Sequence, residues 1–75
     1  MTEHAFTLDR SAHDFVELHN LLKLTGVAPS GGAAKAMVAE GLVRVDGEIE
    51  LRKTRKLRGG ETVRVGGETI VVGAG

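Results

Sequence analysis

The chain has 75 residues, no cysteine, and ten basic side chains against ten acidic ones, so its formal net charge is zero. This length allows one domain with a small core and no deep catalytic cleft, and the lack of cysteine excludes disulfides and thiolate metal sites. The N-terminal residues lack the apolar run of a secretory signal, and no stretch approaches the roughly 20 apolar residues of a membrane-spanning helix. We therefore expect a single domain over residues 1–75 in a monomeric, cytoplasmic protein.

The N-terminal part of the chain predicts a short strand followed by a helix. Residues 4–8 alternate apolar and polar side chains, which favours a strand. Ser11, with Asp14 three residues later, resembles a capping box. We expect a helix from about residue 12 to residue 24, ended by Gly26. Its core face consists of side chains at helical spacing, namely Phe15, Leu18 and Leu22.

A second helix is expected after Ser30, which can cap its first turn. The alanine-rich run 33–39 forms its body, and Gly41 closes it. Small side chains let helices approach closely, so we expect this helix to pack on the first. Gly31 and Gly32 weaken a helix start, which predicts either fraying there or the close approach of a partner's backbone.

From residue 42 the hydrophobic period changes from helical to two. Asp46 and Gly47 lie between alternating runs, and this dipeptide favours the type I′ turn of a β-hairpin. The sequence therefore predicts a hairpin over residues 42–51.

A tandem repeat follows, GGETVRV at 59–65 and GGETIVV at 66–72. Seven residues are too few for a solenoid unit, so the repeat predicts a second hairpin whose last strand, residues 69–72, pairs with the N-terminal strand. Residues 73–75 are expected to form a flexible tail. The fold class we predict is α+β, with two packed helices against a small, mostly antiparallel sheet.

The sequence does not predict catalysis, a cofactor or a metal site. His13 and His19 lie six residues apart, about 240° around a helix, so they cannot share a face, and no metal-binding or nucleotide-binding motif occurs. Asp14 and Glu17 are better explained as a solvated helix face than as an acid/base pair.

The charge is distributed unevenly along the chain. The segment 52–58, called the basic strip below, has five positive side chains and no acid, so the rest of the chain has a net charge of −5. Such a cluster is typical of nucleic-acid binders, although a solvated basic loop has the same composition.

This order of elements resembles the S4 RNA-binding domain family. In length and layout the chain is similar to the small stand-alone S4-like proteins of bacteria. The resemblance covers about residues 18–65 and rests on LLKLTGVAPSGGAAKAMVAEGLVRVDG at 21–47 and LRGGETVRV at 57–65. It implies the S4-like fold, also called the alpha-L motif. In that family RNA lies against the second helix and the neighbouring hairpin. The chain departs from the family pattern at two places. It has Gly31-Gly32 where basic or polar residues are usual, and Asp46 where asparagine is common.

The resemblance and the charge cluster together indicate non-catalytic binding of structured RNA, such as ribosomal RNA or an assembly intermediate. Phe6 and Phe15 are the only aromatics and both lie on core-facing patterns, so we expect recognition by shape and phosphate rather than by base stacking. Arg64 is expected on the outer face of the second hairpin. The candidate RNA-binding residues are Lys35, Arg52, Lys53, Arg55, Lys56 and Arg58, with Lys23 and Arg44 either contacting RNA or only solvating their elements.

Two other functions are compatible with the sequence. In the first, the protein is an interaction adaptor whose basic strip docks an acidic protein surface. In the second, which is weaker because no truncated catalytic motif occurs at either end, it is a regulatory fragment of an RNA-modifying enzyme.

Overall fold

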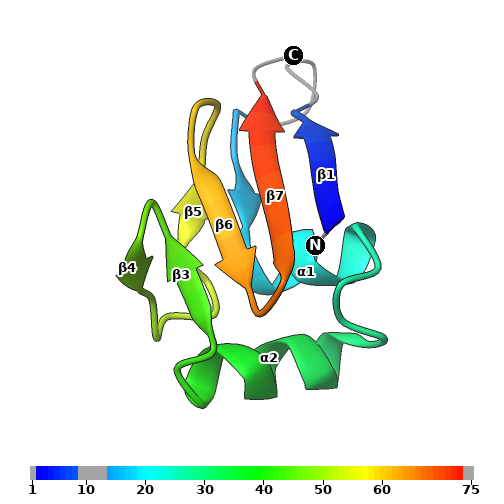
Figure 1. Cartoon of the computed structure of the whole chain (residues 1–75), viewed down its shortest axis with the longest axis vertical. Helices are drawn as coiled ribbons and strands as arrows, with labels where there is room; N and C mark the ends of the chain where they lie inside the picture. Colours follow the sequence, from blue (N-terminus) through cyan, green and yellow to red (C-terminus); the bar gives the residue numbers. More distant parts are fainter. Residues whose placement is uncertain (1, 9–13, 74–75) are drawn as a thin grey trace.

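The computed structural model describes residues 2–8 and 14–73. This part of the chain forms two helices and two small sheets (Figure 1). The elements in chain order are β1 (Thr2–Thr7), β2 (Val16–Glu17), α1 (Leu18–Leu24), α2 (Gly31–Ala39), β3 (Val43–Val45), β4 (Glu48–Ile49), β5 (Lys56–Leu57), β6 (Thr62–Val65) and β7 (Glu68–Gly73). Neither described helix is long and apolar enough to cross a membrane.

The larger sheet has the strand order β1-β7-β6-β3-β4, and all its pairs are antiparallel except β1 with β7. A separate antiparallel pair joins β2 to β5. Figure 1 shows α2 below the sheet and α1 behind its lower end. The predicted α+β class is confirmed, as is the pairing of the last strand with the first. The expected tail is wrong at Gly73, which ends β7, and residues 74–75 lie outside the described part.

Both predicted hairpins are present. Asp46 and Gly47 have φ values of 50° and 87°, as a type I′ turn requires, and they connect β3 to β4. Asp46 also joins the two hairpins, because its Oδ1 accepts a hydrogen bond from the Thr62 amide at 2.9 Å. The second hairpin turns at Gly66, whose φ is 57°. The conformations that only glycine and a few other residues tolerate therefore lie where the sequence predicts them.

The expected start of the first helix is wrong. The helix begins at Leu18, and Glu17 at its N-cap position makes no side-chain hydrogen bond to it. The preceding residues Val16 and Glu17 pair with β5 instead, so a non-local strand pairing replaces the first turn expected from the helical pattern. Ser11, the expected cap, lies outside the described residues, and Asp14 precedes the helix.

The second helix matches its prediction closely. The Ser30 Oγ accepts a hydrogen bond from the Ala33 amide at 3.1 Å. At the other end Gly41, with φ of 74°, donates to the Val38 carbonyl at 3.1 Å, and Leu42 donates to the Met37 carbonyl at 3.2 Å, which is a Schellman closure. The helix begins at Gly31, so the expected frayed start is not observed.

The core lies between the helices and one face of the larger sheet. Side chains from both helices meet alternate side chains of the strands, as expected for an amphipathic helix packed on a two-sided sheet. The fully buried aliphatic side chains include Leu18, Leu21, Leu22, Ala34, Val38, Val43, Leu57, Val63, Ile70 and Val72.

Candidate nucleic-acid interface

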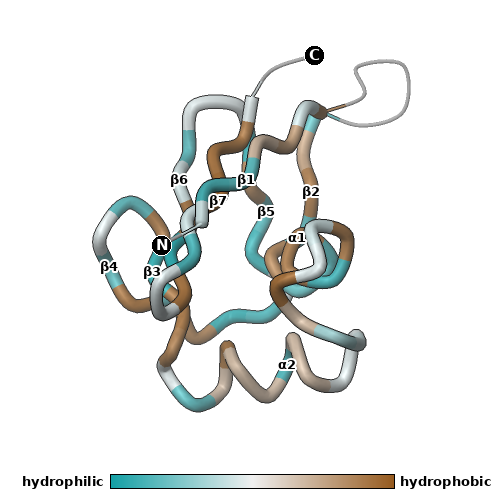
Figure 2. Tube along the Cα trace, turned by 45° about the vertical axis from the view of Figure 1, so that its right-hand side comes forward, coloured by the Kyte–Doolittle hydropathy of each residue, from teal (hydrophilic) through white to brown (hydrophobic). Residues whose placement is uncertain are grey.

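The backbone of the basic strip is fixed to the start of α1. The first amides of a helix have no partner within the helix, and here the amides of Leu18 and His19 donate to the carbonyls of Arg55 and Lys53, at 2.9 and 3.0 Å. The β2–β5 pair anchors the end of the strip next to these contacts. Figure 2 shows the strip as a hydrophilic stretch that passes the helices and leads into β5. The strip therefore presents its side chains from a fixed backbone.

One carboxylate, that of Glu50, organises the beginning of the strip. Glu50 is buried and accepts hydrogen bonds from the Arg52 amide at 3.0 Å and from the Arg52 Nε at 3.2 Å. The Arg55 Nη1 donates to its second oxygen at 2.9 Å. The hydrogen bond from the Arg52 side chain, followed by the one from Arg55, lowers the pKa of Glu50 from 4.5 to about 2. Glu50 is therefore an ionised anchor at neutral pH.

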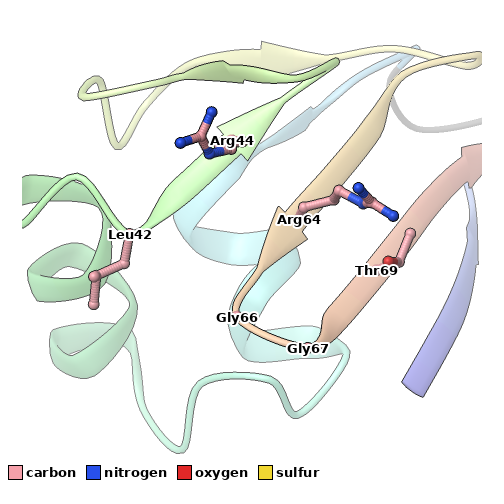
Figure 3. A pocket seen from close by; sticks show the side chains of 6 residues that line it. All are labelled: Leu42, Arg44, Arg64, Gly66, Gly67 and Thr69. Atoms are coloured by element: carbon pink, nitrogen blue, oxygen red, sulfur yellow. The ribbon is translucent and has the colours of Figure 1, made fainter. Parts of the chain in front are cut away.

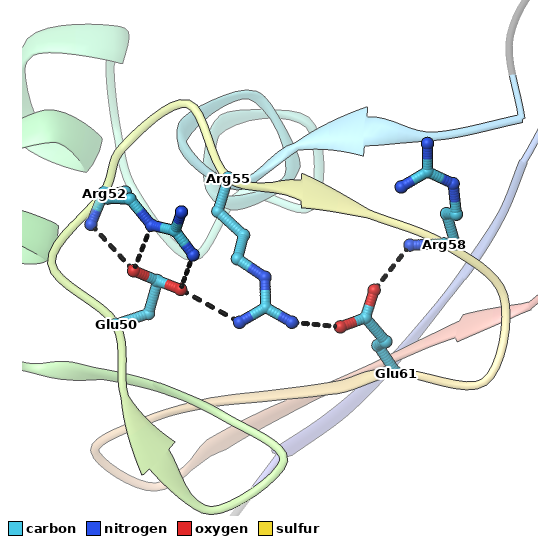
Figure 4. A network of polar contacts seen from close by, with 5 residues as sticks. All are labelled: Glu50, Arg52, Arg55, Arg58 and Glu61. Atoms are coloured by element: carbon cyan, nitrogen blue, oxygen red, sulfur yellow. Dashed lines mark hydrogen bonds and ion pairs between the residues drawn. The ribbon is translucent and has the colours of Figure 1, made fainter.

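Arg55 extends this network to the other end of the strip. Its Nη2 donates to Glu61 at 2.6 Å, and Glu61 accepts from the Arg58 amide at 2.8 Å, as Figure 4 shows. The hydrogen bond to Glu50 raises the pKa of Arg55 further above its usual value. Both acids flank the strip in the sequence, but their convergence on one guanidinium depends on the fold.

The remaining cations of the strip face solvent. Arg52 keeps 75% of its side chain exposed despite its contact with Glu50, and Lys53, Lys56 and Arg58 are also exposed. Of the strip's five positive charges, those of Arg52 and Arg55 contact the carboxylates of Glu50 and Glu61, and the five cations with these two anions leave a local excess of three positive charges. Arg58 lies 3.8 Å from Asp14 at an exposed position, where an ion pair contributes little.

Phe15 is not a core residue, and the prediction that placed it there is wrong. Its ring is partly exposed and lies outside the core cluster, whereas Phe6 does pack on that cluster. The Lys56 Nζ lies 4.9 Å from the centroid of the Phe15 ring, and the Arg58 Cζ lies 5.8 Å from it. Both distances fall within the range of cation–π contacts. The reason is that Phe15 precedes the helix instead of lying on its buried face.

The structure does not bring all the predicted residues together. Lys23 is exposed in the last turn of α1, and Lys35 is exposed on α2. Arg44 lies on the sheet face opposite the core, because its neighbours Val43 and Val45 are buried. Glu50 and its network lie on the other face, since Ile49, the register partner of Arg44, directly precedes Glu50. Arg44 is therefore separated from the basic strip by the sheet.

The described residues contain no group of three or more histidine, aspartate or glutamate side chains that could hold a metal ion. The polar chemistry of the site is that of exposed cations on a hydrogen-bonded backbone, two of which, Lys56 and Arg58, lie over the Phe15 ring. Such a surface can bind anionic groups through arginine forks and lysine point charges.

Comparisons with known proteins place this geometry in a family. The S4 domain matches the chain over residues 10–73. YbcJ of Escherichia coli (strain K12) and YbcJ of Shigella flexneri are each 46% identical to it over 66 residues, which covers 88% of this chain and 94% of theirs. The solution structure of YbcJ from E. coli, described as revealing an alfaL motif involved in RNA-binding, superposes with a TM-score of 0.72 over 93% of this chain and 86% of that one. The chain belongs to the S4 domain family.

Proposed function

We propose that this protein binds structured RNA, and that it does so through the basic strip and α2 without catalysing a reaction. The observation that carries the proposal is the rigid attachment of the strip to α1 and to Glu50. Cations on a fixed backbone can match the spacing of phosphates along a folded RNA, and they lose little freedom on binding. The RNA-binding description of YbcJ and the shared S4 domain support the same function.

Different residues of the strip have different roles in this proposal. Lys53, Lys56 and Arg58 contact phosphates directly because their side chains are exposed. Arg52 does so with the part of its guanidinium that Glu50 leaves open. Arg55 is only 30% exposed and is held by two carboxylates, so we assign it to positioning the strip. Lys23 and Lys35 extend the contact surface over the helices.

Shape and phosphate recognition fits ribosomal RNA or an assembly intermediate, in which double-helical and folded segments dominate. We propose that the protein acts as a monomer in the cytoplasm. Phe15 adds a partly exposed aromatic surface at the end of the strip. Its contacts with Lys56 and Arg58 hold two cations close together.

The test compares an RNA hairpin with an unstructured single strand across a salt series. We expect tighter binding to the hairpin and, for four to six neutralised phosphates, a log-log salt slope of roughly −3 to −5. A Lys53→Gln/Lys56→Gln variant should fold normally and lose most of this binding. The charge-preserving Lys53→Arg/Lys56→Arg variant is the matched control and should retain it. An affinity that does not change with salt, or equal binding by the glutamine variant, would contradict the proposal.

A protein-interaction adaptor is the second candidate function, favoured by two apolar side chains at the surface. Ile49 is 53% exposed and Leu51 is 62% exposed, and both lie close to Gly41 at the end of α2. Capture of partners from lysate with and without ribonuclease separates the two candidates. Protein partners that survive complete RNA digestion would favour the adaptor.

A further inference from the structure

Two arginines lie directly opposite each other on the open face of the larger sheet. Arg44 on β3 and Arg64 on β6 are register partners, and both alternate with buried valines, so their side chains lie on the face away from the core. Neighbouring strands are about 4.8 Å apart. Like charges at directly opposite positions of an antiparallel pair destabilise a sheet. This pair therefore needs an explanation other than stability.

No carboxylate of the described residues forms an ion pair with either arginine. The Arg44 Nη1 donates to the Gly47 carbonyl at 3.3 Å, so this guanidinium is directed to the turn between β3 and β4. On the same row of the sheet the neighbours are Thr69 beside Arg64 and then Glu3 on the far side of Thr69. By strand spacing Glu3 lies about 10 Å from Arg64. The two positive charges are thus left without a protein counterion in the described part of the chain.

The surface around the pair is hollowed. A shallow pocket of about 350 Å³ is lined by Leu42, Arg44, Arg64, Gly66, Gly67 and Thr69. Figure 3 shows the Arg64 side chain directed toward Thr69, with Arg44 on the neighbouring strand and the two glycines at the end of the hairpin. A Cβ atom at Gly66 would meet no heavy atom within 4 Å, so the space beside the turn is open. A ligand of the size of a phosphate group can therefore reach Arg64 and the Thr69 hydroxyl, and Arg44 reaches the same ligand once its side chain turns away from the Gly47 carbonyl.

We propose that Arg44 and Arg64 form a phosphate-binding site on the open face of the sheet, separate from the basic strip. Guanidinium groups bind phosphate oxygens in a bidentate manner, and a bound phosphate removes the repulsion between the two arginines. The phosphate group can come from an RNA backbone or from free phosphate. If the phosphate belongs to an RNA backbone, the inference rests on the proposed function. In that case RNA contacts both sides of the sheet.

The test uses ¹⁵N-labelled protein in phosphate-free buffer, titrated separately with inorganic phosphate and with an RNA hairpin. The reporters are the amide signals of Gly66, Gly67 and Thr69. The Arg44→Gln/Arg64→Gln variant removes two charges from the pocket. The Lys53→Gln/Lys56→Gln variant removes the same number from the basic strip and is the matched control.

We expect phosphate to shift the reporter signals of the wild type and of the strip variant, and not those of the pocket variant. In the RNA arm the pocket variant should show a salt slope reduced by about 1 for each lost phosphate contact. Its melting temperature in phosphate-free buffer should equal or exceed that of the wild type, because the repulsion is gone. A response to RNA alone identifies an RNA backbone phosphate, and a response to inorganic phosphate alone identifies a free phosphate.

Three results would overturn the inference. They are the absence of any reporter shift with either probe, an unchanged shift in the pocket variant, and loss of the phosphate response in the strip variant as well. If RNA binds the wild type and the pocket variant alike with no reporter shift, the inference fails and the proposed function stands. If no RNA binds but phosphate shifts the reporters, the RNA function fails and the phosphate site stands.

Discussion

The guanidinium of Arg55 donates to the carboxylate of Glu50 at 2.9 Å, and this contact joins the middle of the basic strip to the residue that follows β4. The other side of the same guanidinium contacts Glu61, next to the start of β6. The segment between β4 and β6, which includes β5, is thus held at both ends by one side chain. The network uses one of the strip's cations to fix the positions of the others.

Replacing Glu50 by glutamine should destabilise the protein and loosen the strip. Arg52 and Arg55 would lose their shared anion, and Arg55 would stay partly buried with one carboxylate. We expect the free energy of unfolding to fall by about 1–2 kcal/mol, less than for a fully buried pair because the site is close to solvent. Urea denaturation measures this change.

Glu48→Gln is the matched control for that variant, since it neutralises an exposed glutamate on β4 two residues earlier. It should change the free energy of unfolding by less than about 0.5 kcal/mol. Equal losses in both variants would show that the network around Glu50 has no special role.

The lowered pKa of Glu50 predicts an acid-dependent loss of stability. Because the pKa is about 2 in the folded protein and 4.5 ordinarily, the stabilisation is complete above pH 4.5 and disappears as the pH falls toward 2. The full shift corresponds to about 3 kcal/mol, which solvent screening reduces to about 1–2 kcal/mol. Urea unfolding at pH 6 and at pH 2.5 should show a larger drop in the wild type than in Glu50→Gln. Parallel curves for the two proteins would exclude Glu50 as the source.

The two phenylalanines should respond differently to replacement by leucine. Phe15→Leu keeps an apolar side chain but removes the ring beneath Lys56 and Arg58. A cation–π contact at an exposed site contributes about 0.5–1 kcal/mol to holding these two cations in place. If that order is lost, RNA affinity should fall about twofold to fivefold, and the free energy of unfolding should fall by no more than about 1 kcal/mol. Fluorescence anisotropy with a labelled RNA hairpin measures the affinity.

Phe6→Leu provides the comparison, because Phe6 packs on the core. This variant should lose about 1 kcal/mol of stability and keep the RNA affinity of its folded fraction. The reverse pattern, with Phe15 affecting stability and Phe6 affecting affinity, would contradict the placement of Phe15 at the interface.

Sequence features that act locally predicted much of this fold. The Asp46-Gly47 turn and the Ser30 cap are determined by the conformations of a few adjacent residues, and both form as expected. The start of α1 was missed because Val16 and Glu17 pair with residues about 40 positions later in the chain. Such pairing depends on the whole fold, and it overrides the helical pattern that extends back to Phe15.

The candidate site, like the fold, was predictable from the sequence only in part. The charge cluster of the basic strip is visible in the sequence, but its neutralisation by Glu50 and Glu61 is not, since the two acids are eleven residues apart. The register that places Arg44 opposite Arg64 likewise follows from strand pairing across twenty residues. Both features depend on which residues the sheet brings side by side.

Two substitutions of Asp46 can distinguish its structural role at the turn from the effect of its negative charge on RNA binding. Its φ of 50° and the hydrogen bond from Thr62 are both needed by the two hairpins. Asp46→Ala should therefore lower the free energy of unfolding by about 1–2 kcal/mol. Asparagine tolerates the same conformation and accepts the same hydrogen bond, so Asp46→Asn should change stability by less than about 0.5 kcal/mol. It also removes one negative charge, and its RNA affinity should be equal to that of the wild type or higher. Thermal unfolding and hairpin binding of both variants test this, and a destabilised Asp46→Asn protein would mean that the charge itself is needed at the turn.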